Sequence, residues 1–282
     1  MRKNYYDFHF HSLFSDGSMT VDEIFSAAKE KGLKALALTD HDTVLGIPQE
    51  HQASRKYGIS YIPAAEFTAR EVGIKFHVLG YGIQPDNSLL VSYSNKLLDY
   101  MNRRSKKQIE KMQSNGIAIP TEEFFLRASG GPLYRGKLLG VLADYGYLEK
   151  DQIMKLIPEY FSTGAPYYEE DEFPYGSFEE VCSMIHSSGG IAVLAHPAKI
   201  RKKNIELFEK LIQSPLLDGL EVYHPDNPPE IRARLLLEAM KRKLIVTGGS
   251  DFHGIYMKMP LEIGGEFVPD ECADSLSRYL CW

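Results

Sequence analysis

Short apolar strands alternate with helix patterns near both ends of this chain, and this alternation limits the possible folds more than any other feature. Strands are predicted at residues 5–10, 34–39, 59–64, 74–80, 191–195, 217–222 and 244–247. Capping boxes predict helix starts at Thr20, with Glu23, and at Ser177, with Glu180. Repeated strand–helix units of this kind favour an α/β fold on a mainly parallel sheet, either open or closed into a barrel.

The middle of the chain differs from both flanks because no strand pattern interrupts it. Its first part is long, polar and rich in Lys and Arg at helical spacing, and shorter helix patterns follow. We therefore expect a helical insertion at residues 86–160 in a domain formed by residues 1–85 and 161–282. A basic run in the insertion is expected to form a solvated helix face. It consists of Arg103, Arg104, Lys106 and Lys107.

Composition excludes several classes of protein. Hydrophobic residues make up 44% and charged residues 25% of the 282 residues, which is typical of a soluble globular protein. No apolar run reaches the ~18 residues needed to cross a bilayer, and residues 1–12 lack the apolar stretch of a secretory signal. The net charge of -6 argues against a broad nucleic-acid-binding surface. Cys182, Cys272 and Cys281 are scattered and are expected to be thiols in a reducing cytoplasm.

Nine histidines are present, and most of them lie in or beside predicted strands. His9 and His11 alternate at the end of the first strand, so both side chains point to the same side. Carboxylates and further imidazoles accompany the other strands: Asp16, His41, Glu66, His77, His196, Asp251 and His253. A single histidine would more often be an ordinary structural residue, as we expect for His51 and His186. The whole set is expected to converge, because sites in α/β proteins form at strand ends.

A convergent set of imidazoles and carboxylates predicts a metal centre. Without cations, such groups would repel one another and lose their hydration at a high cost. Imidazole and carboxylate ligands without thiolates suit Mn²⁺, Fe²⁺ or Zn²⁺, with Mg²⁺ as a further candidate. The ligands are too many for one ion, so we expect two or three ions that share a bridging carboxylate. Open coordination positions would then indicate catalysis rather than a structural role.

The motifs around these residues resemble those of the PHP (polymerase and histidinol phosphatase) phosphoesterases. The matching strings are DFHFHSLFSDGS, ALTDHDT, AAEFT, HVLGYG, GGIAVLAHP, GLEVYHP and TGGSDFHG. Within the family they look like the bacterial branch of AMP and nucleoside 3′,5′-bisphosphate phosphatases and a related 5′→3′ exoribonuclease. The resemblance implies a distorted (β/α)7-type barrel with a small helical insertion and a trinuclear metal site at the strand ends.

The resemblance also implies a role for each candidate ligand. The three implied ligand groups are His9, His11, Glu66 and Asp251 for a first ion, Glu66, His77 and His196 for a second, and Asp16, His41 and His253 for a third. The ligands also expected to take part in catalysis are Asp16, His41, Glu66, Asp251 and His253. Three more carboxylates look like partners that orient imidazoles, although Asp42 also suits a plain turn. They are Asp7, Asp40 and Asp42.

One departure from the family pattern lies in the insertion. The branch has an Arg-x-His-x-x-Arg string that contributes to phosphate binding, and this chain has Arg135, Lys137 and Gly140 there. Arg135 and Lys137 are therefore expected to bind substrate phosphate, unless they are only basic residues at a helix start. Lysine is a point charge and constrains geometry less than a planar guanidinium. Tyr223 and His224 end a predicted strand and are expected either to touch the substrate or to pack.

These features predict a metal-dependent phosphatase that acts by in-line attack of a metal-bridging hydroxide, without a phosphoenzyme intermediate. The expected substrate is a small phosphorylated molecule, foremost a nucleotide such as AMP or a nucleoside 3′,5′-bisphosphate. Short RNA is an alternative partner. Three other interpretations stay open: a histidinol-phosphate phosphatase, a short-RNA 5′-exonuclease and a non-enzymatic, metal-stabilised structural module.

Overall fold

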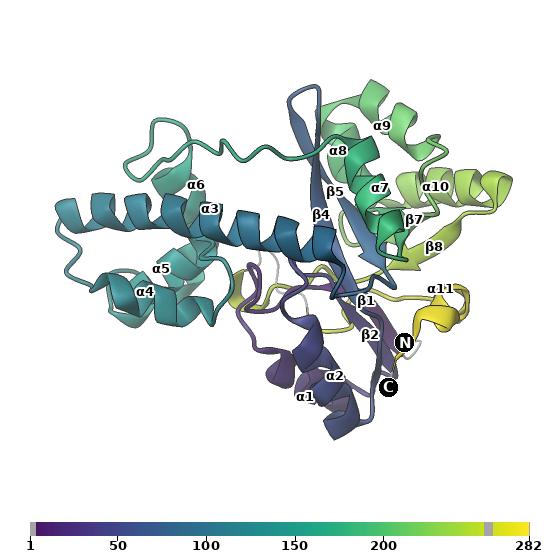
Figure 1. Ribbon diagram of the computed structural model, residues 1–282, viewed down its shortest axis with the longest axis horizontal. Helices are drawn as coiled ribbons and strands as arrows, with labels where there is room; N and C mark the ends of the chain where they lie inside the picture. Colours follow the sequence, from purple (N-terminus) through teal and green to yellow (C-terminus); the bar gives the residue numbers. More distant parts are fainter. Residues whose placement is uncertain (1–3, 257–261, 282) are drawn as a thin grey trace.

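Eight strands form two sheets within the part of the chain that the computed structural model describes, residues 4–256 and 262–281. The first sheet has three parallel strands in the order β1 (Tyr6–Phe10), β2 (Ala35–Leu38) and β3 (Ser60–Tyr61). The second sheet has the order β4 (Ala64–Glu71), β5 (Ile74–Tyr81), β6 (Ile191–Leu194), β7 (Gly219–Tyr223) and β8 (Ile245–Gly248). The long strands β4 and β5 stand near the middle of the molecule (Figure 1).

A hairpin formed by β4 and β5 departs from the expected parallel arrangement. Both β4 and β6 run antiparallel to β5, whereas β6, β7 and β8 are parallel to one another. β3 and β4 are separate strands where the sequence predicted one strand at residues 59–64. Val72 and Gly73 connect β4 to β5 with φ angles of 43° and 78°, the left-handed backbone that a tight two-residue hairpin turn requires. The second sheet is therefore mixed.

The two sheets approach each other at two places. Phe10 at the end of β1 forms a parallel bridge with Phe252, and His41 forms one with Glu66 of β4. These contacts bring both ends of the described chain into one mixed α/β unit, as the predicted α/β class requires. No continuous ladder joins the sheets within the described ranges, and the closed barrel of seven units stays a prediction.

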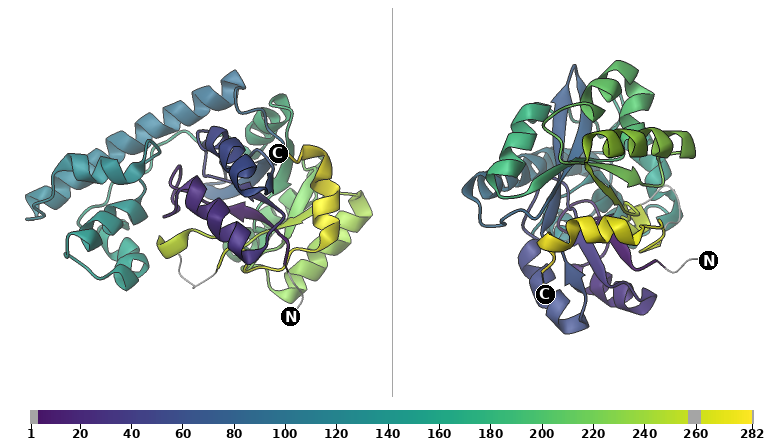
Figure 2. Two further views of the ribbon diagram at one scale, coloured as in Figure 1. Left: turned by 90° about the horizontal axis from the view of Figure 1, so that it is seen from below. Right: turned by 90° about the vertical axis from the view of Figure 1, so that its right-hand side faces the viewer.

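Helices pack around the strands (Figure 2). Their bounds are α1 (Val21–Lys31), α2 (Ile47–Tyr57), α7 (Phe178–Ser187), α8 (Pro197–Lys203), α9 (Ile205–Ile212), α10 (Pro229–Arg242) and α11 (Asp270–Leu276). Short 3₁₀ segments are η1 (Lys150–Gln152), η2 (Gly254–Tyr256) and η3 (Ser277–Tyr279). Both predicted capping boxes are present, at Thr20 before α1 and at Ser177 before α7.

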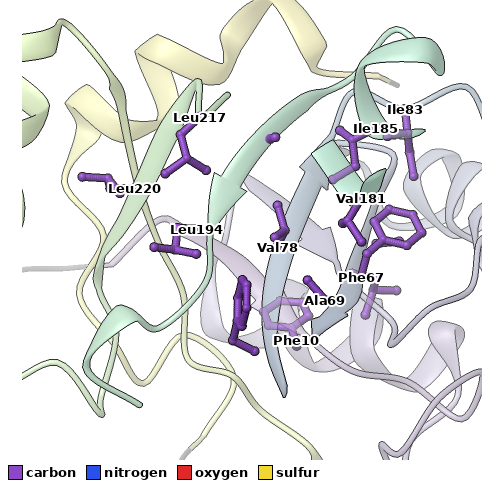
Figure 3. Close-up of a cluster of buried hydrophobic side chains, with 14 of the residues drawn as sticks. Phe10, Phe67, Ala69, Val78, Ile83, Val181, Ile185, Leu194, Leu217 and Leu220 are labelled. Atoms are coloured by element: carbon purple, nitrogen blue, oxygen red, sulfur yellow. The ribbon is translucent and has the colours of Figure 1, made fainter. Parts of the chain in front are cut away.

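Hydrophobic clusters cover both faces of the mixed sheet. Val78 and Leu79 are neighbours on β5, yet they belong to different clusters because successive strand residues point to opposite faces. Figure 3 shows Val78 beside Phe67, with Val181 and Ile185 of α7 nearby. Burial on both faces holds the sheet rigid, which is the condition for positioning a site within it.

A separate group of helices occupies one side of the molecule (Figure 1). It consists of α3 (Ser88–Ser114), α4 (Thr121–Ala128), α5 (Arg135–Asp144) and α6 (Ile153–Phe161). These helices share a hydrophobic cluster that includes Ile109, Phe124, Leu138 and Phe161. The chain then returns along α3 towards α7 through residues 162–176, which we call the return segment. None of the helices in the described residues is both long and apolar enough to cross a membrane.

Candidate metal centre

Main-chain hydrogen bonds between the two sheets bring the predicted ligands together. The backbone N–H of His11 donates to the carbonyl oxygen of Phe252 at 2.9 Å, and the N–H of Asp251 donates to the carbonyl oxygen of His9 at 2.8 Å. On the other side, the N–H of Glu66 donates to the carbonyl oxygen of Asp40 at 3.2 Å. The bonds that align the sheets therefore also fix the positions of the side chains.

Glu66 lies at the centre of the candidate site. It is the third residue of β4 and is fully buried, and its two carboxylate oxygens face different imidazoles. Oε2 lies 3.3 Å from Nε2 of His9 and 3.3 Å from Nε2 of His11. Oε1 lies 3.0 Å from Nδ1 of His77 and 2.8 Å from Nε2 of His196. Glu66 therefore contacts imidazoles from several different segments through both of its oxygens.

Two groups of ligand atoms surround the oxygens of Glu66. In the first, Oδ1 of Asp251 lies 3.3 Å from Nε2 of His9 and 3.2 Å from Nε2 of His11. In the second, Nδ1 of His77 lies 3.4 Å from Nε2 of His196. The structure thus brings together both sets that the resemblance implied for the first two ions.

The third predicted group forms around Asp16. Its Oδ1 lies 3.3 Å from Nε2 of His253, and its Oδ2 lies 3.7 Å from Nε2 of His41. His41 also turns Nδ1 towards Oε2 of Glu66, at 3.3 Å. His11 is a fourth neighbour, with Nδ1 at 3.6 Å from Oδ1 of Asp16. All nine predicted ligands therefore lie in one continuous cluster, with His41 and His11 each between two groups.

Hydrogen bonds on the far side of the rings set which nitrogen can bind a cation. Nδ1 of His9 lies 2.7 Å from Oε1 of Glu221, and Nδ1 of His253 lies 2.7 Å from the carbonyl oxygen of Asp251. A proton on each Nδ1 donates to these oxygens, so Nε2 keeps its lone pair and points into the cluster. The geometry therefore prepares both imidazoles as ligands.

Glu221 is a functional residue that the sequence analysis missed. This fully buried carboxylate of β7 accepts two hydrogen bonds. Oε1 accepts one from Nδ1 of His9, and Oε2 accepts one from the backbone N–H of His196 at 2.6 Å. Glu221 thus positions one residue of the first predicted ligand group, His9, and one of the second, His196. The sequence did contain a signal for Glu221, because it is an acid within an otherwise apolar strand. A buried acid of this kind must have a partner.

Asp251 is held from outside by two groups. Its Oδ2 accepts from Nζ of Lys199 at 2.9 Å and lies 3.2 Å from Nε2 of His224. Nδ1 of His224 accepts the backbone N–H of Asp226, so Nε2 carries the proton and donates to Asp251. Oδ1 of Asp251 is left to face the cluster. His224 therefore orients a ligand in this structure and does not project towards open space, since it is buried.

Three residues around the site have left-handed backbone although none is glycine. They are Asp42, His196 and Asp251, with φ angles of 55°, 28° and 55°. Such conformations cost roughly 1–3 kcal/mol each and are concentrated at functional sites. His196 immediately follows β6, so this backbone turns its imidazole towards Glu66.

The electrostatics of the cluster favour bound cations. Burial alone would raise the pKa of Glu66, but the imidazoles of His77 and His9 hold it well below its usual range. Burial lowers the pKa of His41 to about 3, which keeps that ring neutral. For His11, burial is outweighed by Asp251 and Glu66, which raise its pKa to about 10. Ionised carboxylates around His11 thus create a negative potential that either a proton or a metal ion satisfies.

Unpartnered nitrogen atoms test whether this donor set suits a metal. Nε2 of His11, Nδ1 of His41 and Nδ1 of His196 are buried and have no hydrogen-bond partner among the described residues. Buried polar atoms are normally bonded, so each exception requires an explanation. For His11 and His41 these atoms face Glu66, and a divalent cation would satisfy them. The cluster therefore has the chemistry of an imidazole–carboxylate metal site.

Among the described residues, the three aspartates expected to orient imidazoles form no direct hydrogen bond to an imidazole, and Asp40 reaches His11 only through the hydroxyl of Ser15. Asp40 accepts the N–H and the hydroxyl of Ser12, at 2.7 and 2.6 Å. Asp42 accepts the N–H and the hydroxyl of Thr68, both at 2.7 Å. Asp7 accepts backbone N–H groups that follow β8. All three anchor the backbone that carries the ligands, and Glu221 orients His9 instead.

The predicted substrate residues divide into two kinds. Arg135 lines a cavity of about 280 Å³ beside Asp16, whereas Lys137 is fully buried and does not line it. Nζ of Lys137 donates to the carbonyl oxygens of Leu13 and Pro132, at 2.6 and 2.9 Å. The geometry does not support a phosphate contact for Lys137, because its ammonium group already has partners inside the protein.

Tyr223 packs rather than facing the cluster. Its ring lies against both hydrophobic clusters of the sheet, and burial, Cys272 and Glu271 raise the pKa of its phenol. These neighbours belong to α11, on the outside of β8. The packing alternative is therefore the one that the structure favours for Tyr223. His51 and His186 lie outside the cluster, as expected.

Comparison with known proteins identifies the family. The sequence profile of the PHP domain matches residues 7–223, which is more than half of the chain. The chain belongs to the PHP domain family. Among curated relatives, the PHP chain is 28% identical over 257 residues to a phosphoribosyl 1,2-cyclic phosphate 1,2-diphosphodiesterase from Eggerthella lenta, covering 90% of this chain and 96% of the relative.

Two further relatives act on nucleic-acid components. A 3′,5′-nucleoside bisphosphate phosphatase from Chromobacterium violaceum is 27% identical, covering 88% of this chain and 86% of the relative. The 5′-3′ exoribonuclease Rnm from Escherichia coli is also 27% identical, covering 88% of this chain and 85% of the relative. All three relatives are phosphoesterases, so the predicted family and reaction class are confirmed.

Solved structures agree with this assignment. A protein from Bifidobacterium adolescentis that is assigned to the metal-dependent phosphoesterases superposes with a TM-score of 0.82 at 29% identity, covering 97% of this PHP chain and 96% of that protein. An amidohydrolase from Chromobacterium violaceum shares the fold, with a TM-score of 0.77 at 24% identity, covering 98% and 97% of the two chains.

Proposed function

We propose that this PHP protein hydrolyses a phosphomonoester of a small, nucleotide-sized substrate at a cluster of two or three divalent metal ions. The observation that carries the proposal is the position of Glu66, whose two oxygens face different imidazoles. Those near Oε2 are His9, His11 and His41, and those near Oε1 are His77 and His196. The names of the relatives support phosphoester chemistry, and two of them support a nucleotide or RNA substrate.

Three sets of residues would hold the ions. Following the geometry, they are His9, His11, Glu66 and Asp251; Glu66, His77 and His196; and Asp16, His41 and His253. Bound ions would neutralise the phosphoryl oxygens and lower the pKa of water towards ~7. Mn²⁺, Fe²⁺ and Zn²⁺ fit this set of nitrogen and oxygen donors, and Mg²⁺ fits its carboxylates alone.

The residues of the chain contribute orientation and charge. Glu221 and the carbonyl oxygen of Asp251 hold His9 and His253 with Nε2 free. Lys199 and His224 fix Asp251 so that one oxygen stays available. Preorganised side chains of this kind do not have to rearrange during the reaction, which is a main source of enzymatic rate enhancement.

The cavity beside Asp16 is the proposed place for the rest of the substrate. It is bounded by α3, α5, α6 and the return segment, and its volume of about 280 Å³ is at the small end of ligand pockets. We propose that residues 86–160 form an insertion that supplies this wall, while residues 1–85 and 161–282 supply the catalytic cluster. A substrate with one phosphoryl group in the cluster would place its other end against the insertion.

Hydrolysis of an aryl phosphate tests the proposal directly. We expect turnover that a chelator abolishes and an added divalent metal restores. His9→Ala should lose at least 100-fold in kcat/KM, because one ligand of the first group is removed. His186→Ala is the matched control, since His186 pairs with Asp218 away from the cluster. Full activity in the presence of chelator, or in His9→Ala, would contradict the proposal.

A further inference from the structure

The ring of His41 lacks the support that the rings of His9 and His253 have. Its buried Nδ1 has no hydrogen-bond partner among the described residues, and its Nε2 lies 3.7 Å from Oδ2 of Asp16, which is longer than a hydrogen bond. By contrast, Nδ1 of His9 and Nδ1 of His253 each lie 2.7 Å from an oxygen acceptor. The direction of the His41 ring therefore depends on the backbone that carries it.

That backbone is bonded to β4 on both sides of His41. The N–H of Asp42 donates to the carbonyl oxygen of Glu66 at 2.8 Å, and the N–H of Glu66 donates to the carbonyl oxygen of Asp40 at 3.2 Å. Asp42 has a φ angle of 55°, in the left-handed region. A residue other than glycine keeps this conformation only where the surrounding structure holds it. The turn at residues 40–42 therefore depends on further bonds to keep its shape.

The carboxylate of Asp42 receives these further bonds. Oδ1 accepts the backbone N–H of Thr68 and Oδ2 accepts the hydroxyl of Thr68, both at 2.7 Å. Oδ1 also accepts the hydroxyl of Tyr93 at 2.8 Å. All three donors are neutral, and Asp42 is only 2% exposed. Loss of one donor would therefore leave a buried acceptor less well satisfied and would loosen the turn.

Tyr93 brings this donor from the helical insertion. It lies in the second turn of α3, whose first turns stand beside the β4–β5 hairpin (Figure 1). Its ring centroid lies 6.1 Å from that of Phe67 on β4 and 5.9 Å from that of Phe173 in the return segment, in edge-on contacts. Burial and the nearby Asp42 raise the pKa of the phenol, so the hydroxyl stays protonated and donates.

Further along α3, polar side chains bond the return segment and not the metal cluster. The hydroxyl of Tyr100 donates to the carbonyl oxygen of Glu170 at 3.3 Å and lies 3.2 Å from Oδ1 of Asp171. Nε and Nη2 of Arg104 donate to the carbonyl oxygen of Glu169 at 3.2 and 2.8 Å. Arg104 is consequently buried, at 8% exposed, although the sequence predicted a solvated position. Tyr100 thus offers a matched control for Tyr93 on the same helix.

We propose that Tyr93 is a positioning residue for His41, which it supports through Asp42 by holding the turn at residues 40–42 in the shape that directs the imidazole into the cluster. The inference rests on the proposed function, because His41 acts as a ligand only where the cluster binds cations. The helical insertion then has a role in the metal centre as well as in the wall of the cavity. A tyrosine that only fastened α3 to the sheet would affect stability and not metal binding.

Metal titration of Tyr93→Phe tests the proposal, because this change removes the hydroxyl and keeps the ring contacts. Calorimetric titration of metal-free protein with Mn²⁺ is compared for the wild type, Tyr93→Phe and His41→Ala. The binding step that His41→Ala weakens or removes is the step that uses His41. Tyr93→Phe should weaken this same step roughly 10-fold, the lower end of the range for residues that orient ligands, and leave the other steps unchanged. Tyr100→Phe should match the wild type in every step.

A second measurement needs no metal. The nuclear magnetic resonance signals of the histidine rings report their surroundings in metal-free, ¹⁵N-labelled protein. Tyr93→Phe should shift the ring signals of His41 and leave those of His51 and His186 in place, which also shows that the variant is folded. Tyr100→Phe should leave all three rings unchanged. Because Tyr93 acts through Asp42, adding Tyr93→Phe to Asp42→Ala should shift the His41 signals no further.

These measurements separate the inference from the proposed function. Wild-type protein that binds Mn²⁺, with the same affinities and the same His41 signals in Tyr93→Phe, would keep the metal-dependent phosphatase and overturn the role of Tyr93. Wild-type protein that binds no Mn²⁺ would contradict the proposed function. The His41 signals in Tyr93→Phe would then still decide whether Tyr93 positions this ring.

Discussion

At the scale of single residues, charged groups in this protein owe their roles to partners that are distant in the sequence. Glu221 and His9 are 212 positions apart and form a buried pair at 2.7 Å. Asp218 and His186 form a pair of the same length on the surface. The two pairs differ in burial, and burial is what makes a carboxylate able to control the orientation and basicity of an imidazole.

The first prediction concerns Glu221→Gln. The amide keeps the size of the side chain but removes the negative charge that holds the proton on Nδ1 of His9, so metal affinity should fall about 10- to 100-fold. Calorimetric titration with Mn²⁺ or Zn²⁺ would measure this change. Asp218→Asn provides a matched control at the exposed pair and should leave the affinity unchanged. An unaltered affinity in Glu221→Gln would contradict the assigned role.

Sequence patterns predicted which side chains converge in the cluster, but not the residues that hold those side chains in place. His9, His11 and Asp251 were identifiable because so many ionisable residues beside predicted strand ends rarely occur by chance. Lys137 and Arg104 were misjudged, one as a phosphate contact and the other as a solvated residue, because burial depends on packing between distant segments. A sequence alone does not reveal that the carbonyl oxygen of Leu13 will meet Lys137.

At the scale of elements, helix starts were predictable from local signals, whereas strand direction was not. The capping boxes at Thr20 and Ser177 act within one turn, so both helices begin where the pattern indicates. The β4–β5 hairpin depends on Val72 and Gly73, which lack the usual Asn-Gly or Asp-Gly signal. Glu66 consequently lies inside a strand and not after one.

A second prediction follows from the attachment of α5 to the loop after β1. The ammonium group of Lys137 on α5 makes this attachment through its hydrogen bond to Leu13. Lys137→Met would leave the carbonyl oxygens of Leu13 and Pro132 without this donor. The free energy of unfolding should fall by about 1–3 kcal/mol at neutral pH. Urea unfolding would measure the change. Lys106→Met, at an exposed position of α3, should be neutral.

The same lysine predicts a pH dependence. Burial lowers the pKa of Lys137 to about 8 in the folded protein, below the value of ~10.4 in an unfolded chain. Between these values the unfolded state binds more protons, so the contribution of Lys137 to stability rises with pH and is constant below about 8. The stability difference between the wild type and Lys137→Met should therefore be larger at pH 9.5 than at pH 7.5. A difference that shrinks over this interval would refute the burial argument.

At the scale of the whole molecule, the cluster joins both sheets, since its predicted ligands lie in β1, β4 and β5 and in the segments that follow β1, β2, β6 and β8. Ions that bind only the folded state stabilise it, by about 2.7 kcal/mol at a free concentration of 100 times Kd. We therefore predict that the melting temperature rises with metal concentration and falls when a chelator is added. Calorimetric scans at several Mn²⁺ concentrations would show this, and His77→Ala should weaken the response. A melting temperature independent of metal would contradict the prediction.

The bond from the backbone N–H of Asp251 to the carbonyl oxygen of His9 ties β1 to the segment that follows β8. During synthesis on the ribosome, His9 emerges long before Asp251, so this bond forms only after the residues between them have been made. A product that stops before residue 251 would lack the complete set of predicted donors. Cation binding would thus distinguish chains that include residues 251–253 from shorter products.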